Sequence, residues 1–338
     1  MHKITLGIVA ASAAVLLALS GCASGANSGS GSSSNPSNFE KKSPLKIGYS
    51  VFDRSDPYWN AYVKGIQFQA KKYKASVVIS DDKSSEALQV SGSQNLINQG
   101  ISALIVSPIQ PSALPATITA AHAAKIPVII GDVGATGDYD AYVLSDNYNG
   151  GVLAAQYMEK AFAGKPGVHE VGIISLLPDV AVGVDREKGF TDTLAKDPNF
   201  KVVSTLVGQT VDKSYTSAQD MLTANPNLEA IYGINGNCAL GAAKALDQAG
   251  KSVKNGFVLI GFNGDPGEIT AIAAGEETAT VAQDSYGQGK LDVDLAMDLL
   301  NGKPIKFDDE KTKTKTFPVS IVDASNLDAY KAKVAAQK

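Results

Sequence analysis

Short apolar runs alternate with longer amphipathic segments from about residue 45 onward. The runs are rich in Ile, Val and Leu, which is typical of buried strands. Those of the first half cover residues 45–51, 77–80, 101–106, 126–130 and 141–144. The segments between them have apolar residues at helical spacing, and they cover residues 57–73, 84–99 and 114–125. Strands that alternate with helices predict a parallel sheet with helices on both faces.

The same alternation starts again near residue 150. We expect helices over residues 150–162, 186–196, 216–224 and 239–249. We expect strands over residues 171–175, 202–206, 230–233 and 257–261. The sequence therefore predicts an α/β protein of two doubly wound lobes. Ligands of such sheets bind beyond the carboxyl ends of the strands, so two lobes facing each other there would form a cleft.

The N-terminal apolar segment is of another kind. Residues 4–19 follow Lys3 and are almost wholly apolar, but they are shorter than the ~20 residues that a membrane span needs. They end in Leu19-Ser20-Gly21-Cys22, which resembles the lipobox of bacterial lipoproteins. We therefore expect residues 1–21 to be a lipoprotein signal peptide and Cys22 to carry the lipid. An ordinary secreted protein is the alternative.

The segment after the leader has the composition of a tether. Residues 22–44 consist largely of Ser, Gly, Asn and Ala, with little apolar surface to stabilise a fold. Such a coil reaches about 25 Å. We expect the folded part to start near Leu45. The protein would then work outside the cytoplasm, lipid-anchored to the membrane on the outer face of a Gram-positive cell or in a periplasm.

Composition argues against several classes of function. Without Lys3 the chain has 29 basic and 34 acidic residues, which is no basis for binding nucleic acid. Beyond the leader the only histidines are His122 and His169, and the only thiol besides Cys22 is Cys238. We interpret Cys238 as a small buried residue at a helix start. Because phosphate-binding and nucleophile motifs are also missing, we expect no metal, no cofactor and no enzyme.

Polar residues gather where the expected strands end. These loops cover residues 52–59, 131–132, 184–186, 235–237, 262–265 and 282–284. The first contains Pro57-Tyr58-Trp59, and the others include Gly131-Asp132 and Phe262-Asn263. With the segments 145–147, 186–190 and 279–283, this ordered set resembles type I periplasmic binding proteins of the ribose-binding kind. These proteins are the solute-binding components of sugar ABC transporters. The resemblance extends from Leu45 to about Val322.

The resemblance implies a sugar site with residues from both lobes. Tyr58 and Trp59 would stack on the apolar face of the ring. The polar contacts would come from Asp56, Asp132, Arg186, Asn235, Asn263 and Gln283. Carboxylates and amides pair with neighbouring hydroxyls, and a guanidinium donates to several oxygens at fixed geometry. These residue types therefore suit a sugar or polyol on chemical grounds as well.

Each candidate also has a structural interpretation. Trp59 could belong to the core, and asparagines beside glycines are ordinarily turn residues. Arg186 could form a structural ion pair. The second-rank candidates are Asp53, Arg54 and Asp212.

The site also departs from the ribose-binding pattern. Val133 stands where ribose binders carry an arginine, Val211 stands near the place of an aromatic, and Asn263 replaces an aspartate. These residues are therefore as consistent with a hexose, another pentose, a polyol or an inositol as they are with ribose.

We expect the first lobe to cover residues 45–147 and 284–313, and the second to cover residues 148–283 and 314–338. The chain would cross between them near residues 146–147, 283–284 and 312–316. A monomeric receptor would close on its ligand about these hinges and deliver it to an ABC permease. The alternatives are a hydrolase, a signalling accessory that binds a sugar-like autoinducer, and a nucleoside or amino-acid binding protein.

Overall fold

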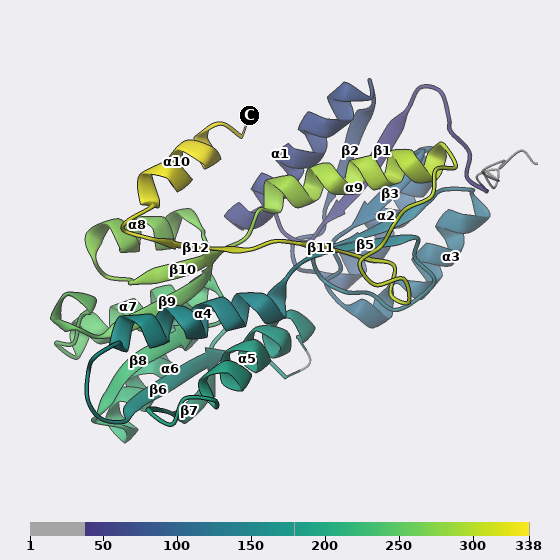
Figure 1. Ribbon diagram of the computed structural model, residues 1–338. Coiled ribbons are helices and arrows are strands. Elements are labelled where there is room, and N and C mark those ends of the chain that lie inside the picture. Colours follow the sequence, from purple (N-terminus) through teal and green to yellow (C-terminus); the bar gives the residue numbers. More distant parts are fainter. Residues whose placement is uncertain (1–37, 179, 338) are drawn as a thin grey trace, which may run out of the picture. The chain divides into compact units, whose positions relative to one another are not determined.

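The computed structural model describes residues 38–178 and 180–337, and it contains two six-stranded sheets (Figure 1). All pairs of neighbouring strands in the first sheet are parallel, in the order β2-β1-β3-β4-β5-β11. Its strands are β1 (Lys46–Val51), β2 (Ser76–Asp81), β3 (Ala103–Val106), β4 (Val128–Gly131), β5 (Ala141–Ser145) and β11 (Thr314–Phe317). Its helices are α1 (Pro57–Lys72), α2 (Glu86–Asn98), α3 (Pro115–Ala123) and α9 (Ser285–Leu300), with a short 3-10 turn at Pro111–Ala113.

The second sheet repeats this order as β7-β6-β8-β9-β10-β12, and only its last strand, β12, is antiparallel. Its strands are β6 (His169–Ser175), β7 (Phe200–Val207), β8 (Leu228–Gly233), β9 (Val258–Asn263), β10 (Ala279–Ala282) and β12 (Ser320–Asp323). Its helices are α4 (Asn147–Phe162), α5 (Ala181–Leu194), α6 (Val211–Ala224), α7 (Gly236–Gln248), α8 (Pro266–Ala274) and α10 (Leu327–Ala335), with a 3-10 turn at Val253–Asn255. The predicted doubly wound α/β fold is confirmed.

Local signals explain where the elements begin and why they are buried. β3 and β4 are fully buried, and apart from Gly131 they consist of Ala, Val, Leu and Ile, as expected for central strands covered on both faces. Proline opens α1, α3 and α8, where its missing N–H leaves no intrahelical bond unmade. Asp56 and Asn235 cap α1 and α7 through their side chains. The carboxyl ends of the strands therefore lead directly into capped helices, which places polar side chains there.

In each lobe the helix that follows the first strand packs against a helix that arrives from the other lobe. α1 lies beside α9, and α5 lies beside α4 (Figure 1). Both contacts depend on glycine. A Cβ at Gly65 would lie 2.1 Å from the Tyr286 carbonyl oxygen, and one at Gly189 would lie 2.0 Å from the Tyr148 carbonyl oxygen. The backbones of each pair can therefore approach more closely than side chains would allow.

The third crossing lies later than the sequence analysis placed it. β11 pairs with β5 in the first sheet and β12 pairs with β10 in the second, so the chain changes lobe at residues 318–319. The expected crossing at residues 312–316 and the lobe boundary at 313 were therefore wrong. The segment around β11 is polar and rich in Thr and Lys, so no apolar run indicates a strand there. It is a strand because it pairs with β5.

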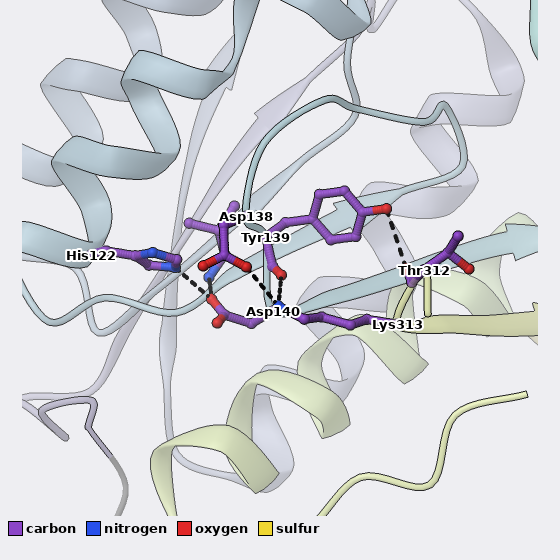
Figure 2. Close-up of polar contacts among 7 residues, drawn as sticks. His122, Asp138, Tyr139, Asp140, Thr312 and Lys313 are labelled. Atoms are coloured by element: carbon purple, nitrogen blue, oxygen red, sulfur yellow. Dashed lines mark hydrogen bonds and ion pairs between the residues drawn. The ribbon is translucent and has the colours of Figure 1, made fainter. Parts of the chain in front are cut away.

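Side-chain bonds tie the residues just before β11 to the first lobe, as Figure 2 shows. The Lys313 ammonium lies 2.9 Å from Asp138 Oδ1 and donates to the Tyr139 carbonyl oxygen at 2.7 Å. The Tyr139 hydroxyl donates to the Thr312 carbonyl oxygen at 3.2 Å. The residues just before β11 are therefore bonded to the first lobe.

The folded part also starts earlier than Leu45. The Glu40 N–H donates to the Lys125 carbonyl oxygen at 3.0 Å, and the Phe39 ring lies 5.9 Å from the His122 ring. The expected tether boundary at residue 44 was therefore too late. The expected signal peptide over residues 1–21 and the expected lipidation site Cys22 lie outside the described residues. Over the ranges that the structure describes, no helix is both long and apolar enough to cross a membrane.

Candidate functional site

The first lobe contributes a buried carboxylate at the end of β4. Asp132 is 6% exposed and has a φ of 64°, a left-handed conformation that aspartate tolerates better than most residues. Its Oδ1 accepts a hydrogen bond of 2.6 Å from the Tyr58 hydroxyl. Burial raises the pKa of Asp132, and the Tyr58 bond and the positive charge of Arg186 oppose that shift. The carboxylate is thus held away from water with one protein donor on Oδ1.

Tyr58 reaches Asp132 because of the turn that starts α1. Asp56 is the N-cap, and its Oδ1 accepts from the Tyr58 N–H at 2.8 Å. This capping role occupies one of the oxygens that the sequence analysis assigned to the ligand. Burial raises the pKa of the Asp56 carboxyl.

The second lobe contributes a buried guanidinium. Arg186 is 3% exposed, and its Nε donates to Asn147 Oδ1 at 2.8 Å. Its Nη1 donates to the Ile234 carbonyl oxygen at 3.0 Å, and its Cζ lies 3.7 Å from the centre of the Phe262 ring. Burial lowers the pKa of Arg186, whereas the negative charge of Asp132 raises it. The two buried charges therefore stabilise each other electrostatically although they come from different lobes.

Arg186 lies on a helix rather than in the loop that we expected. α5 begins at Ala181, so Arg186 is in its second turn. The N-cap, Val180, makes no side-chain capping bond, so the sequence has no signal for this start. Asn147, the first residue of α4, reaches the guanidinium because α4 and α5 pack closely at Gly151 and Gly189.

A run of side-chain amides links the ends of the two sheets. Gln283 Nε2 donates to Asn263 Oδ1 at 2.8 Å, and Asn263 Nδ2 donates to Asp265 Oδ2 at 2.9 Å. On the other side, Gln283 Oε1 accepts from the Ser145 hydroxyl at 2.6 Å. Asn263 has a φ of 127°, which is strained for a residue with a Cβ. The structure thus brings Asn263 and Gln283 together, and their contact with a ligand stays a prediction.

Asn235 has a structural function that was considered from the sequence. It is half-buried, and its Oδ1 caps α7 by accepting from the Cys238 N–H at 2.8 Å. Cys238 itself is buried at the start of that helix, which confirms its interpretation as a core residue. Burial raises the pKa of its thiol, so it is poorly suited to act as a nucleophile.

Trp59 is part of the core of the first lobe. It is 6% exposed, its ring stacks on that of Phe52 with the centroids 5.4 Å apart, and it forms a T-shaped pair with Tyr58 at 4.9 Å between centroids. The structural interpretation therefore accounts for its position. Contact between Trp59 and a ligand stays a prediction.

The second-rank candidates are dispersed. Asp53 organises its own loop by accepting from the Ser55 N–H at 2.8 Å and from the Ser84 hydroxyl at 2.7 Å. Arg54 is exposed, and Asp212 lies exposed in the first turn of α6 beside Tyr215. The structure does not bring Asp212 together with the other candidates.

A pocket of about 650 Å³ adjoins three of the predicted residues, and this volume suits a small molecule. Tyr58, Asn263 and Gln283 line it, together with residues of α8 and α10. Asp132 and Arg186 are not among its lining residues. The polar residues thus form a deeper, covered part and a part that is open to solvent.

Sequence reasoning missed Ser145, Asn147 and Gln288 as side chains of the site. The first two lie in the segment 145–147 that carries the resemblance, so their neighbourhood was marked although their contacts were not. Gln288 lies inside α9, where no spacing or motif distinguishes it. Among residues 38–178 and 180–337, no group of three or more His, Cys, Asp or Glu could hold a metal ion.

Comparison with known proteins agrees with this architecture. The model of the periplasmic binding protein domain family matches residues 47–304. The ribose import binding protein of Bacillus subtilis (strain 168) is 31% identical over 276 residues, which cover 80% of this chain and 87% of that protein.

Two solved structures are also similar. An ABC transporter periplasmic solute binding protein from Actinobacillus succinogenes with bound D-allose has a TM-score of 0.76 and 25% identity, covering 85% of this chain and 100% of that one. The Caulobacter myo-inositol binding protein bound to myo-inositol has a TM-score of 0.73 and 26% identity, covering 86% and 97%. The chain therefore belongs to the type I periplasmic binding proteins, a family that binds solutes and does not catalyse reactions.

Proposed function

We propose that this chain captures a monosaccharide or polyol between its two lobes and delivers it to an ABC permease. The observation that carries the proposal is the pair of buried opposite charges, Asp132 from the first lobe and Arg186 from the second. Relatives named for ribose, D-allose and myo-inositol support the ligand class.

Asp132 and Arg186 each keep a hydrogen-bonding atom that no described protein bond uses, and these atoms suit neighbouring hydroxyl groups of a ligand. The bond from Tyr58 uses Oδ1 of Asp132, so Oδ2 can accept from a ligand hydroxyl. The two protein bonds of Arg186 use Nε and Nη1, so Nη2 can donate to a ligand oxygen. Because a sugar hydroxyl both donates and accepts, it can satisfy the two groups at once.

Access to the pair requires movement of the lobes. Asp132 and Arg186 are almost fully covered, so a ligand reaches them only after the lobes separate. The chain crosses between the lobes at residues 145–147, 282–285 and 318–319, and rotation there would open and close the site. Ligand contacts made from both lobes favour the closed form, and that form would dock the permease.

A ligand screen by thermal unfolding tests this function. The purified full-length protein is heated with single pentoses, hexoses, polyols and inositols. A ligand at 100 times its Kd stabilises the folded state by about 2.7 kcal/mol, which raises the Tm measurably. At least one compound should raise the Tm of the wild type and raise that of Arg186→Ala far less. If only amino acids or nucleosides do so, the ligand class is wrong.

The lipid anchor is a separate part of the proposal, and it rests on Cys22. In cells fed a radiolabelled fatty acid, the wild-type protein should incorporate label and fractionate with membranes. Cys22→Ser should abolish both, and Cys238→Ser is the matched control that should keep them. Equal labelling of wild type and Cys22→Ser would contradict the anchor and leave the sugar site untouched.

A further inference from the structure

We infer that Gln288 is a positioning residue for the sugar site, because it is the source of a directed run of hydrogen bonds that orients Asp132 and Gln283. The inference rests on the proposed function. Gln288 lies on α9, has no exposed surface and donates to Tyr58 of α1 and to Ser145 at the first crossing. Neither its position in the sequence nor the resemblance pointed to it.

One branch of the run leads into the first lobe. Gln288 Nε2 donates to the Tyr58 hydroxyl oxygen at 3.1 Å. The Tyr58 hydroxyl in turn donates to Asp132 Oδ1 at 2.6 Å. All three side chains are buried, so water does not compete for these bonds.

The other branch leads into the second lobe. Gln288 Nε2 donates to the Ser145 hydroxyl oxygen at 3.0 Å, and Ser145 donates to Gln283 Oε1 at 2.6 Å. From Gln283 the run continues through Asn263 to the Asp265 carboxylate. Ser145 ends β5 and Gln283 directly follows β10, so this branch passes through the first and second crossings.

The chemistry of the two ends determines the direction of every bond. Ionised Asp132 and Asp265 can only accept, so every hydrogen bond must point toward one end or the other. A hydroxyl has one proton to donate, so neither Tyr58 nor Ser145 can supply both directions. One member of the run must donate both ways, and the amide nitrogen of Gln288 does so.

This direction has a consequence for the ligand. Because Gln288 donates to Tyr58, the only proton of that phenol points at Asp132 Oδ1. Because Gln288 also donates to Ser145, the Ser145 proton points at Gln283 Oε1 and the Gln283 amide nitrogen faces Asn263. Without Gln288 either hydroxyl can rotate. Ordering the groups that bind the ligand then costs free energy on binding, so the affinity falls.

A matched pair of variants separates positioning from packing. Gln69 lies on α1 and is also buried, and its Nε2 donates to Asp294 Oδ1 on α9 at 2.6 Å. Gln69→Met therefore makes the same chemical change in the same pair of helices, away from the run. Affinities for D-ribose, D-allose and myo-inositol are measured by calorimetry. We expect Gln288→Met to weaken binding at least tenfold and Gln69→Met less than twofold.

A double-mutant cycle tests whether Gln288 acts through Asp132. If it does, the loss caused by Gln288→Met should shrink to less than threefold in an Asp132→Asn background, because the oriented acceptor is already gone. Folded Gln288→Met protein with wild-type affinity would overturn the inference. So would an equal loss in both backgrounds, since a residue that orients Asp132 must lose part of its effect when that carboxylate is replaced.

Neutron diffraction from the ligand-free, perdeuterated wild type tests the run without any ligand. Deuterium should lie between Tyr58 and Asp132, between Ser145 and Gln283, and on both bonds from Gln288. A proton arrangement in which Tyr58 donates to Gln288 would overturn the inference. If no probe sugar binds the wild type, the proposed function fails, while the neutron result still decides the direction of the run.

Discussion

Each lobe positions a polar side chain of the site with an equivalent pair of helices, but the buried charge that it contributes is negative in the first lobe and positive in the second. In the first lobe α1 packs on α9, and at the site Tyr58 of one helix meets Gln288 of the other. In the second lobe α5 packs on α4, and Arg186 of one helix meets Asn147 of the other. In both lobes an amide side chain orients a side chain of the neighbouring helix: Gln288 of α9 bonds to Tyr58 of α1, and Asn147 of α4 bonds to Arg186 of α5.

The difference lies in where the charge is placed. The first lobe puts its carboxylate on a strand end and reaches it through the Tyr58 hydroxyl, whereas the second puts its guanidinium directly on the helix. Either charge would be costly to bury without an opposite partner. The comparison teaches that Asp132 and Arg186, which come from different lobes, stabilise each other electrostatically.

The largest effect should come from removing the charge of the second lobe. Arg186→Ala should weaken binding of the ligand found by the thermal screen about 100-fold, or about 2.7 kcal/mol. The reason is that a charged donor is lost and Asp132 stays buried without its partner. Calorimetric titration measures the effect. A loss of affinity below threefold in folded protein would show that the charge of Arg186 is not needed for ligand binding, and would contradict its pairing with Asp132.

The two glycine contacts should matter equally for stability. Gly189→Ala and Gly65→Ala each place a Cβ about 2 Å from a backbone oxygen, so each should lower the free energy of unfolding by about 1–3 kcal/mol. Chemical denaturation measures this. Gly134→Ala is the control, because its Cβ would lie 3.4 Å from the nearest atom, the Tyr142 hydroxyl oxygen. A large effect in only one lobe would show that the helix pairs are not equivalent.

The stability of the second lobe should depend on pH, because it buries a pair of glutamates, Glu268 and Glu277, beside β9. Glu277 is 1% exposed, and its carboxyl group interacts with that of Glu268. Burial raises its pKa, and the nearby carboxyl groups of Glu268 and Asp265 add to that shift. Burial and Asp265 also raise the pKa of Glu268, to about 8.

Raised pKa values mean that the folded state holds protons that the unfolded chain has already released above about pH 4.5. The free energy of unfolding should therefore fall as the pH rises from about 4.5 toward 8. Glu277→Gln should flatten that decline and stabilise the protein at pH 8 by about 1–2 kcal/mol. Thermal unfolding across this range measures it, with the exposed neighbour as control in Glu276→Gln. Parallel profiles for wild type and Glu277→Gln would refute the explanation.

The smallest effect should come from the other arginine. Arg54 is exposed, and the bonds described for it involve its backbone: its N–H donates to Asp81 Oδ1 at 3.1 Å, and its carbonyl oxygen accepts from Asn60 at 2.6 Å. Arg54→Ala keeps both, so affinity should change less than twofold in the same titration. A tenfold loss would place Arg54 in the site and make the two arginines equivalent.

Much of the fold followed from local pattern. Apolar runs at regular spacing predicted both sheets, and the errors fall where a strand or helix has no local signal, as at Thr314–Phe317 and at the start of α5. The polar residues at the strand ends could also be predicted, because they follow the apolar runs directly in the sequence. Trp59 shows the limit, since a single aromatic residue in a loop is equally compatible with a ligand and with the core that the structure shows around it.

The sequence by itself determined two doubly wound lobes, their family and the polar residues at the ends of their strands, because these depend on periodicity and on residues that are neighbours in the chain. Only the tertiary structure decided which side chains bond to one another. Tyr58 meets Asp132 across 74 residues and Gln288 across 230. Partners at such separations are chosen by how the helices pack, and no local pattern encodes that choice.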